Sequence, residues 1–469
     1  MLAAFGGTSV ANYAFSLLMG RLLLPGDFGA LAFVQTLLLI AGLLLESGIP
    51  WSLARELALA EPGARAALVR GATVSNLLLA GGLSALLTLL YALGPLRGGL
   101  ESWPVTLLAA AALPLMALVG VARGAAQGSE RYGALALVST SEVVGKAVVG
   151  SVLVLLGLKV AGAVGGFVAG ALLSILLGAL SLRGTLAFSP VGPVRRLTAR
   201  MAGPMFGALL GSALLLNLDL LLLKVLPGGG RVASGQYQAA IVLANAPYFL
   251  ASSVLVPLVF AQMVRRPSLA ATLHDLGRVL RLAALYVLPL EFLLLLLPGQ
   301  VLGLLFPAAY GSATLALQLR AVGTALLILV TLISAAYQAS GHAHHAARWL
   351  LALSAAETLL LLIAVPAAGA VGAALVFAGV LLVSVLGLGG HYLRQLAPAE
   401  RPGLWVWGGR YGLAVAGGAL VAIAAPHLGV PQIPASALAL AMFAVVCRVQ
   451  RLHLDEPAST SAHLSTEGA

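Results

Sequence analysis

The sequence predicts an all-α polytopic membrane protein with about fourteen transmembrane helices. Apolar residues make up 61% of the 469 residues, charged residues make up 9%, and the mean hydropathy is +1.04. A water-soluble globule of this length carries many more charges. The apolar runs are also long enough for helices to cross a hydrocarbon core of ~30 Å, and turn residues separate them.

The predicted spans follow one another with short connections. They lie near residues 2–24, 27–54, 68–94, 103–123, 132–157, 160–182, 201–226, 233–263, 279–298, 316–338, 346–366, 370–393, 404–425 and 431–449. The first turn, Pro25-Gly26-Asp27, shows the logic: proline ends one helix, glycine permits the reversal, and Asp27 is expected to cap the next helix. The broken segment 298–312 is predicted to lie along the outer interface without spanning.

Lysine and arginine residues divide unevenly between alternate connections. Eighteen fall on one side, with Arg123 counted among them, and six fall on the other, with Lys224 and Arg320 counted among those. The positive-inside rule therefore places both termini in the cytoplasm and the protein in the cell membrane. The net charge of +11 reflects this orientation, so nucleic acid is not an expected partner.

The longest basic connection, 183–200, divides the chain into two similar halves. The segment AAQGSERYGALALV in the first half is echoed by AYQASGHAHHAARWLLAL in the second. We expect a six-helix bundle at 1–182, a cytoplasmic linker at 183–200, and a second six-helix bundle at 201–395. Because an even number of spans returns the chain to the same face, the repeat is parallel. Two further helices at 404–450 have no counterpart, and the polar tail 451–469 is predicted to be disordered.

No motif indicates an enzyme. The sequence has no phosphate-binding Walker loop and no strand-borne dinucleotide fingerprint, so no cofactor is expected. The single cysteine, Cys447, cannot form an intramolecular disulfide. His342, His344 and His345 lack a cysteine or nearby carboxylate to complete a metal site, which favours a polar loop. Small-residue stripes such as Gly203, Gly207 and Gly211 are typical of close helix packing.

Ionisable and amide side chains inside the spans are the candidate binding residues, because each costs free energy in lipid unless it faces a cavity or a partner. The candidates for substrate or ion binding are Asp219, Glu46, Glu142, Lys146, Glu357, Asn217, Asn245, Gln35, Arg21 and Arg55.

These candidates differ in what their surroundings predict. Glu142 and Lys146 are four residues apart, so they either neutralise one another or serve a cavity. Asp219 has no neutralising neighbour within a turn, which favours a cavity-facing position. Glu357 either binds a coupling ion or is protonated, with H+ and Na+ as alternatives. Arg21 and Arg55 lie near span ends, where phosphate binding competes with snorkelling to headgroups.

Two segments also resemble a known family. GRLLLPGDFGALAFVQ followed by LARELA near the start, and NLDLLLLKVLPGGGRVASGQYQAA (residues 217–240), are similar to the polysaccharide transporters of the multidrug/oligosaccharidyl-lipid/polysaccharide (MOP) superfamily. The resemblance implies two pseudo-symmetric six-helix bundles that form a V around a central cavity, with two extra C-terminal helices. It also implies a flippase for a polyprenyl-diphosphate-linked oligosaccharide that works by alternating access.

The resemblance implies partners as well: the lipid-linked oligosaccharide, membrane lipids, a glycan polymerase and glycosyltransferases. Three alternatives stay open. A multidrug cation antiporter of the same superfamily fits the acids within the spans, and a peptidoglycan lipid II flippase fits the number of helices. A non-transporting scaffold for glycan synthesis would leave the acids unexplained.

Overall fold

The computed structural model describes residues 2–182, 203–263, 287, 290–339 and 342–394. Within these ranges the regular structure is entirely helical, which confirms the predicted all-α class. Seven segments of the described chain are long and apolar enough to cross a membrane. The predicted linker 183–200, the two extra helices 404–450, the tail 451–469 and half of the span 279–298 lie outside the described residues.

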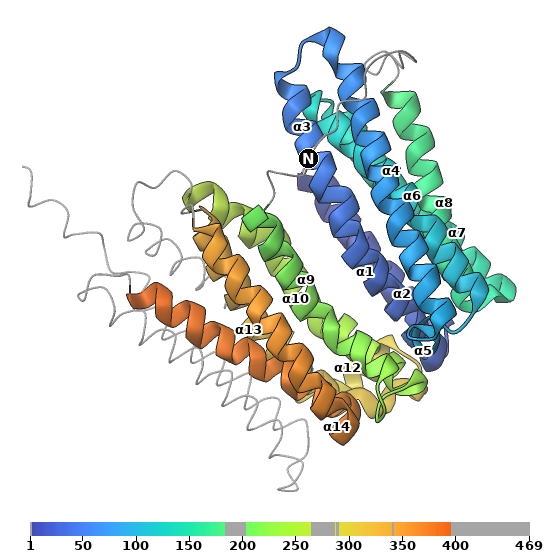
Figure 1. Ribbon diagram of the computed structural model, residues 1–469. Coiled ribbons are helices and arrows are strands. Elements are labelled where there is room, and N and C mark those ends of the chain that lie inside the picture. Colours follow the sequence, from blue (N-terminus) through green and yellow to red (C-terminus); the bar gives the residue numbers. More distant parts are fainter. Residues whose placement is uncertain (1, 183–202, 264–286, 288–289, 340–341, 395–469) are drawn as a thin grey trace, which may run out of the picture.

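The first half of the chain forms one group of helices. Its elements are α1 (Leu2–Leu22), α2 (Pro25–Leu43), η1 (Leu44–Gly48, a π-turn), α3 (Ile49–Leu59), α4 (Pro62–Leu93), α5 (Arg97–Leu100), α6 (Trp103–Gly128), α7 (Tyr132–Leu153), η2 (Val154–Leu158, a π-turn) and α8 (Lys159–Ser181). The second half contains α9 (Gly203–Val225), α10 (Arg231–Met263), α12 (Pro298–Leu305), η3 (Ala308–Ala313, a 3-10 turn), α13 (Thr314–Ala339) and α14 (Ala343–Arg394). The two groups meet at one end and diverge at the other, as the arms of a V (Figure 1).

Two of the seven apolar segments each contain a chain reversal. Tyr132–Ser181 turns back at Gly157 (φ 89°), and Ala343–His391 turns back at Gly369 (φ 55°). A positive φ is accessible to glycine at little cost. After the second turn Gly387 lies against the Trp349 ring, so the two arms of α14 run side by side. The predicted division of these segments into 132–157 with 160–182, and 346–366 with 370–393, is thereby confirmed.

Neighbouring helices pack closely at glycines, where no side chain separates the two backbones. A Cβ on Gly166 would lie 2.6 Å from the Gly150 Cα, and one on Gly211 would lie 2.8 Å from the Leu350 Cβ. These contacts pack α8 onto α7 and α14 onto α9. The predicted packing role of the glycine stripes is confirmed at these positions.

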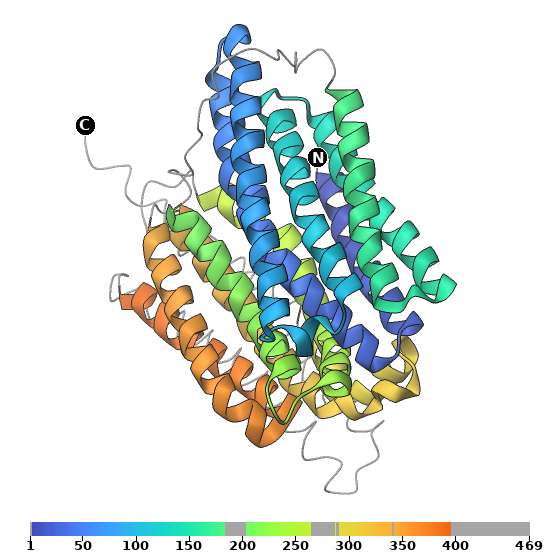
Figure 2. The ribbon, with the colours of Figure 1, turned by 45° about the vertical axis from the view of Figure 1, so that its right-hand side comes forward.

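The two halves touch at the narrow end of the V through α2 and α10. A Cβ on Gly235 would lie 1.6 Å from the Pro25 carbonyl oxygen, and one on Gly29 would lie 2.4 Å from the Ser234 hydroxyl. The α12–η3 segment underlies the same end and contacts the first half (Figure 2): Arg21 donates to the Leu304 and Leu305 carbonyls at 2.8 and 2.9 Å.

Ion pairs join the same surfaces. Arg231 of α10 bonds Asp27 of α2 at 2.7 Å and lies 3.0 Å from Glu101, while Lys224 of α9 bonds Glu101 at 2.5 Å. We call these four side chains the narrow-end latch. Asp27 therefore has a different role from the predicted helix cap. The helix begins at Pro25, its N-cap is Leu24, and the Asp27 carboxylate reaches across to the other half instead.

Gly235→Val should destabilise the contact between the halves, because no space exists for a side chain against Pro25. Overpacking of this kind costs about 1–3 kcal/mol of unfolding free energy. Thermal unfolding of the purified protein in detergent would measure it. Gly82→Val on α4 is the control, because nothing lies within 4 Å of a Cβ at that exposed glycine. Equal melting temperatures for the two variants would contradict the close contact.

Candidate functional site

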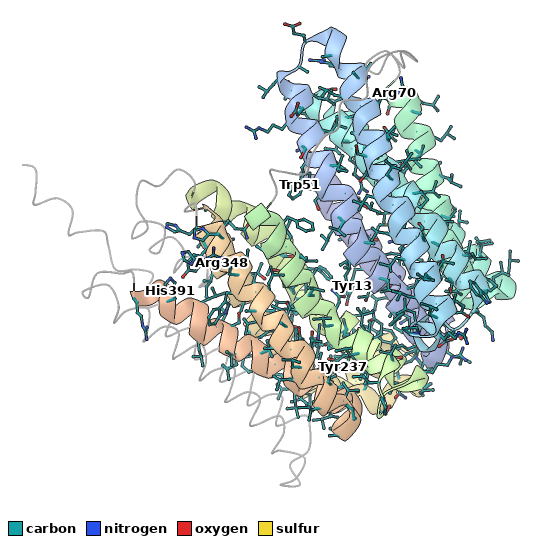
Figure 3. The ribbon with its side chains drawn as sticks, viewed as in Figure 1. Tyr13, Trp51, Arg70, Tyr237, Arg348 and His391 are labelled. Atoms are coloured by element: carbon teal, nitrogen blue, oxygen red, sulfur yellow. The ribbon has the colours of Figure 1, made fainter. Side chains whose placement is uncertain are left out.

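A cavity of about 900 Å³ lies between the two halves of the V. Tyr13 and Trp51, labelled in Figure 3, belong to its wall in the first half. The wall is rich in amides and hydroxyls from both halves: Thr8, Asn12, Ser16, Gln35, Thr36, Ser47, Gln127, Ser139, Asn217, Gln238 and Asn245. A cavity of this volume lies at the upper end of the ~300–1,000 Å³ typical of small-molecule sites.

Four acidic or basic side chains line this cavity, and all come from the first half: Glu46, Arg123, Glu142 and Lys146. The Arg123 guanidinium donates one hydrogen bond to Glu46 and another to Glu142, so one cation holds two carboxylates. The side chains of the three residues are 20–26% exposed. The formal charges of the four residues cancel, which leaves the cavity wall close to neutral.

The sequence of α6 explains how Arg123 reaches the cavity. Gly120, Gly124 and Gly128 recur every four residues and form a stripe on one face of the helix. A Cβ on Gly124 would lie 2.5 Å from the Pro50 carbonyl oxygen, and one on Gly120 would lie 2.7 Å from the Leu45 carbonyl oxygen. This stripe lets α6 approach η1 and α3 backbone to backbone, and Arg123 beside it meets Glu46.

Local backbone structure determines where the Glu46 and Glu142 carboxylates lie. Glu46 lies on the π-turn η1, a distortion often found at functional sites. Glu142 lies on α7, where a Cβ on Gly170 of α8 would be 2.3 Å from the Glu142 carbonyl oxygen. The close packing of α8 against this turn of α7 holds the Glu142 side chain toward the cavity.

Lys146 is held differently from Arg123. Its ammonium donates to the Asn12 amide oxygen and lies 5.1 and 4.9 Å from the ring centroids of Phe15 and Phe167. A cation over aromatic faces is stabilised without being neutralised. Within the described part of the chain Lys146 makes no ion pair, so it is the cavity cation most available to an anionic ligand.

The structure places six of the ten candidates at the cavity: Glu46, Glu142, Lys146, Gln35, Asn217 and Asn245. Glu142 and Lys146 each hydrogen-bond a different helix, and no mutual ion pair joins them in the described structure. Arg21 lies instead at the narrow end against the α12 backbone, and Arg55 is exposed on α3.

The expectation that Asp219 faces the cavity is wrong. Asp219 is fully buried in the second half, where its carboxylate accepts from Arg320 and from the Tyr237 hydroxyl. Glu357 is also fully buried in that half and does not line the cavity. Asp219 pairs with Arg320, which is 101 residues away in the sequence, so its spacing from nearby residues did not reveal the pair. This pair holds Asp219 inside the second half and away from the cavity.

Three cations counted as connection residues lie elsewhere as well. Arg123 is within α6 at the cavity, Arg320 is fully buried within α13, and Lys224 is 4% exposed at the end of α9 in the narrow-end latch. Sequence reasoning therefore missed Arg123 as a site residue. The available signal was the Gly120–Gly124–Gly128 stripe, because close packing of these glycines on a neighbouring helix places Arg123 at the same contact.

With this geometry in place, comparison with known proteins identifies the class. The family described as "Polysaccharide biosynthesis protein" matches residues 2–263, which is more than half of the chain. The protein thus belongs to the polysaccharide biosynthesis protein family. No curated protein matches the sequence.

Solved structures show the same fold. Lipid II flippase MurJ in an inward closed conformation matches with a TM-score of 0.75 at 12% identity, over 96% of this chain and 98% of that chain. An inward-facing multidrug resistance MATE family transporter of the MOP superfamily matches at 0.60 and 15% identity, over 82% and 94%. A MOP superfamily transporter from Pyrococcus furiosus Vc1, described as having a binding pocket of reverse polarity, matches at 0.53 and 16%, over 83% and 94%. These likenesses confirm the predicted MOP-type architecture.

Arg123→Met should lower the melting temperature of the purified protein, because Glu46 and Glu142 would be left facing one another without a cation. Breaking a partly buried pair costs on the order of 1–3 kcal/mol after allowance for solvent screening. Adding Glu46→Gln and Glu142→Gln to Arg123→Met should recover most of the loss. Arg348→Met, at an exposed arginine of α14, is the control. Failure of the triple variant to recover stability would show that packing, and not charge, is what Arg123 contributes.

Proposed function

We propose that the protein translocates a polyprenyl-diphosphate-linked oligosaccharide across the cytoplasmic membrane by alternating access. The observation that carries the proposal is the cavity between the halves, lined by many amides and hydroxyls and one lysine without an ion-pair partner among the described residues. Family membership supports a role in polysaccharide biosynthesis.

The amides and hydroxyls of the wall suit the sugar part of such a substrate. Amide groups both donate and accept hydrogen bonds, as sugar hydroxyls do. The buried Gln238 Oε1 has no hydrogen-bond partner in the described structure, so it can accept from a ligand. Tyr13, Trp51 and Phe249 add aromatic faces to the same wall.

Lys146 is the proposed contact for the diphosphate. The Lys146 ammonium binds an anionic phosphate oxygen more strongly than the neutral Asn12 amide oxygen, so a phosphate oxygen can take that place. Arg123 already faces two carboxylates, whose negative charges make it a poorer site for an anion than Lys146. The lipid tail would stay in the membrane while the headgroup crosses.

The shape supports a state open toward the cytoplasm. The narrow-end latch closes the side that the distribution of cations assigns to the exterior, and the halves diverge on the opposite side (Figure 1). Rocking of one half against the other would break the latch and open the cavity outward. A glycan polymerase and glycosyltransferases are the proposed functional partners.

A labelling experiment tests this orientation. In a Cys447→Ser background, Gly98→Cys at the narrow end should react with a membrane-impermeant thiol reagent in whole cells. Gly63→Cys at the wide end should react only after the cells are opened. Both glycines are exposed and have nothing within 4 Å of a Cβ, unlike the crowded Gly228 and Gly229 of the tri-glycine turn. The reverse pattern would invert the orientation.

One rival is a multidrug cation antiporter, which needs a free acid in its cavity. The two acids that line this cavity are both held by Arg123, so the described wall offers no unpaired carboxylate to an organic cation. Another rival is a lipid II flippase. The likeness to MurJ at 12% identity establishes the fold and not the substrate.

Deletion of the gene should cause lipid-linked oligosaccharide to accumulate on the cytoplasmic leaflet, with loss of a surface glycan. Lys146→Met should fail to restore the glycan, because the diphosphate contact is gone, and a tenfold or greater loss of flux is expected from one lost charge-assisted bond of about 1.5–3 kcal/mol. Lys159→Met, at an exposed lysine in the α7–α8 turn, should restore it fully.

The same strains distinguish the proposed function from the antiporter and lipid II flippase alternatives. Unchanged glycans with new sensitivity to cationic dyes would favour the antiporter. Accumulated lipid II with intact surface glycans would favour peptidoglycan synthesis. Equal complementation by Lys146→Met and Lys159→Met would remove Lys146 from substrate binding.

A further inference from the structure

A second group of ionisable residues lies inside the C-terminal half, away from the cavity. It consists of Asp219 on α9, Tyr237 on α10, Arg320 on α13 and Glu357 on α14, and all four side chains are fully buried. Tyr237, labelled in Figure 3, marks its place toward the narrow end. We call these four residues the buried cluster.

Asp219 is fully satisfied within the buried cluster. Its carboxylate accepts from the Arg320 guanidinium, from the Tyr237 hydroxyl at 2.6 Å and from the Leu220 amide at 2.8 Å. Arg320 also donates to the Leu216 carbonyl at 2.8 Å, and its guanidinium carbon lies 3.4 Å from the Phe377 ring centroid. The aspartate and the arginine therefore form a neutral, ionised pair.

Glu357 differs from Asp219 in its hydrogen bonding. Neither of its carboxyl oxygens has a hydrogen-bond partner in the described structure, although both are buried. An ionised carboxylate left in this state costs several kcal/mol, whereas a neutral carboxylic acid avoids most of that cost. The local charge count leads to the same conclusion, because one arginine cannot neutralise two carboxylates.

Within the described structure Arg320 has a hydrogen-bond donor without an acceptor, which matches the free acceptor oxygens of Glu357. The Arg320 Nε–H is buried and has no acceptor among the described residues, while Glu357 has two free acceptor oxygens. Arg320 is also the group that acts electrostatically on Glu357. A deprotonated Glu357 could thus accept a hydrogen bond from this free Nε–H if the guanidinium turned toward it.

The same arginine leaves little reason to expect a metal ion here. A sodium or calcium ion needs several oxygen ligands around it, but the guanidinium already supplies the positive charge beside Asp219. The described residues contain no group of three or more His, Cys, Asp or Glu that could hold a metal.

From these observations we propose that the buried cluster is a proton-binding site, with Glu357 as the proton acceptor and Arg320 as a built-in cation in place of a metal ion. The proposal rests on the transport function proposed above, because it assigns the ion that drives transport. Binding of the proton leaves Arg320 with Asp219. Its release draws the guanidinium toward Glu357.

The position of the cluster connects it to the cavity. Asn217 on α9 and Gln238 on α10 line the cavity, and they lie two residues from Asp219 and one from Tyr237. A shift of Arg320 changes the bonds that tie α13 to Leu216 and Asp219 of α9, and Asp219 in turn holds the Tyr237 hydroxyl of α10. The cavity-facing sides of α9 and α10 can respond through these bonds. In the described structure Glu357 interacts electrostatically with Arg320 and Tyr237, and both of these bond Asp219.

Infrared difference spectroscopy of the purified protein, without substrate, tests the protonation directly. Raising the pH should remove a carboxylic-acid C=O band in the wild type, and Glu357→Gln should lack that change. Glu291→Gln is the matched control. Glu291 is also buried, and both of its carboxyl oxygens lack a hydrogen-bond partner in the described structure, but no charged group interacts with it as Arg320 does with Glu357. The pH-dependent band should persist in Glu291→Gln. Its persistence in Glu357→Gln, or its absence from the wild type, would overturn the proposal.

Transport in proteoliposomes gives the second measurement. A pH gradient should accelerate lipid-linked oligosaccharide transfer by the wild type, and in Glu357→Gln the ratio of rates with and without the gradient should fall to unity. Replacement of Na+ by choline should change neither rate, and a dependence on Na+ would overturn the proposal. A pH-dependent Glu357 band in a protein that transfers no lipid-linked oligosaccharide would refute the proposed substrate while supporting the proton site.

Discussion

The cost of an unmatched charge in an apolar helix bundle is the constraint on which the rest of this structure depends. The ion pairs of the described structure join different helices or connections, and most of these segments are distant in sequence. Asp219 and Arg320 are 101 residues apart, Glu46 and Arg123 are 77, and Asp27 and Arg231 are 204. A helix that carries half of such a pair has few acceptable rotations about its axis, so the pairs determine which faces of the helices meet.

Glycine determines which of these charges can reach one another. The stripe on α6 permits backbone contact with α3 and so brings Arg123 to Glu46. Gly235 and Gly29 let α10 and α2 touch at the narrow end, where Arg231 then reaches Asp27. Van der Waals packing of small residues is the main attraction between helices in lipid. Here it also sets the distances over which the electrostatic contacts form.

The two halves treat their charges differently. The first half presents its charged residues to the cavity, partly exposed, whereas the second contributes amides to the cavity and keeps Asp219, Arg320 and Glu357 in its interior. A partly exposed cation can exchange its partner for an incoming anion. A fully buried network is closed to an incoming anion, and the proposed response there is to the gain or loss of a proton. This division separates the surface proposed to bind the substrate from the group proposed to respond to the driving ion.

The sequence by itself determined the order and approximate bounds of the described helices, including the reversals between residues 157 and 160 and between residues 366 and 370. These features are local: an apolar run of sufficient length must span, and a glycine with positive φ permits the turn. It also identified six residues of the cavity wall, since polar groups within spans need a polar environment. Tertiary structure alone decided that Arg123 belongs to the cavity and that Asp219 does not. Near a helix end, connection and cavity residues look alike in sequence, and the partner that buries Asp219 comes from α13. The rotation of each helix depends on contacts with distant helices, and those contacts exist only in the assembled fold.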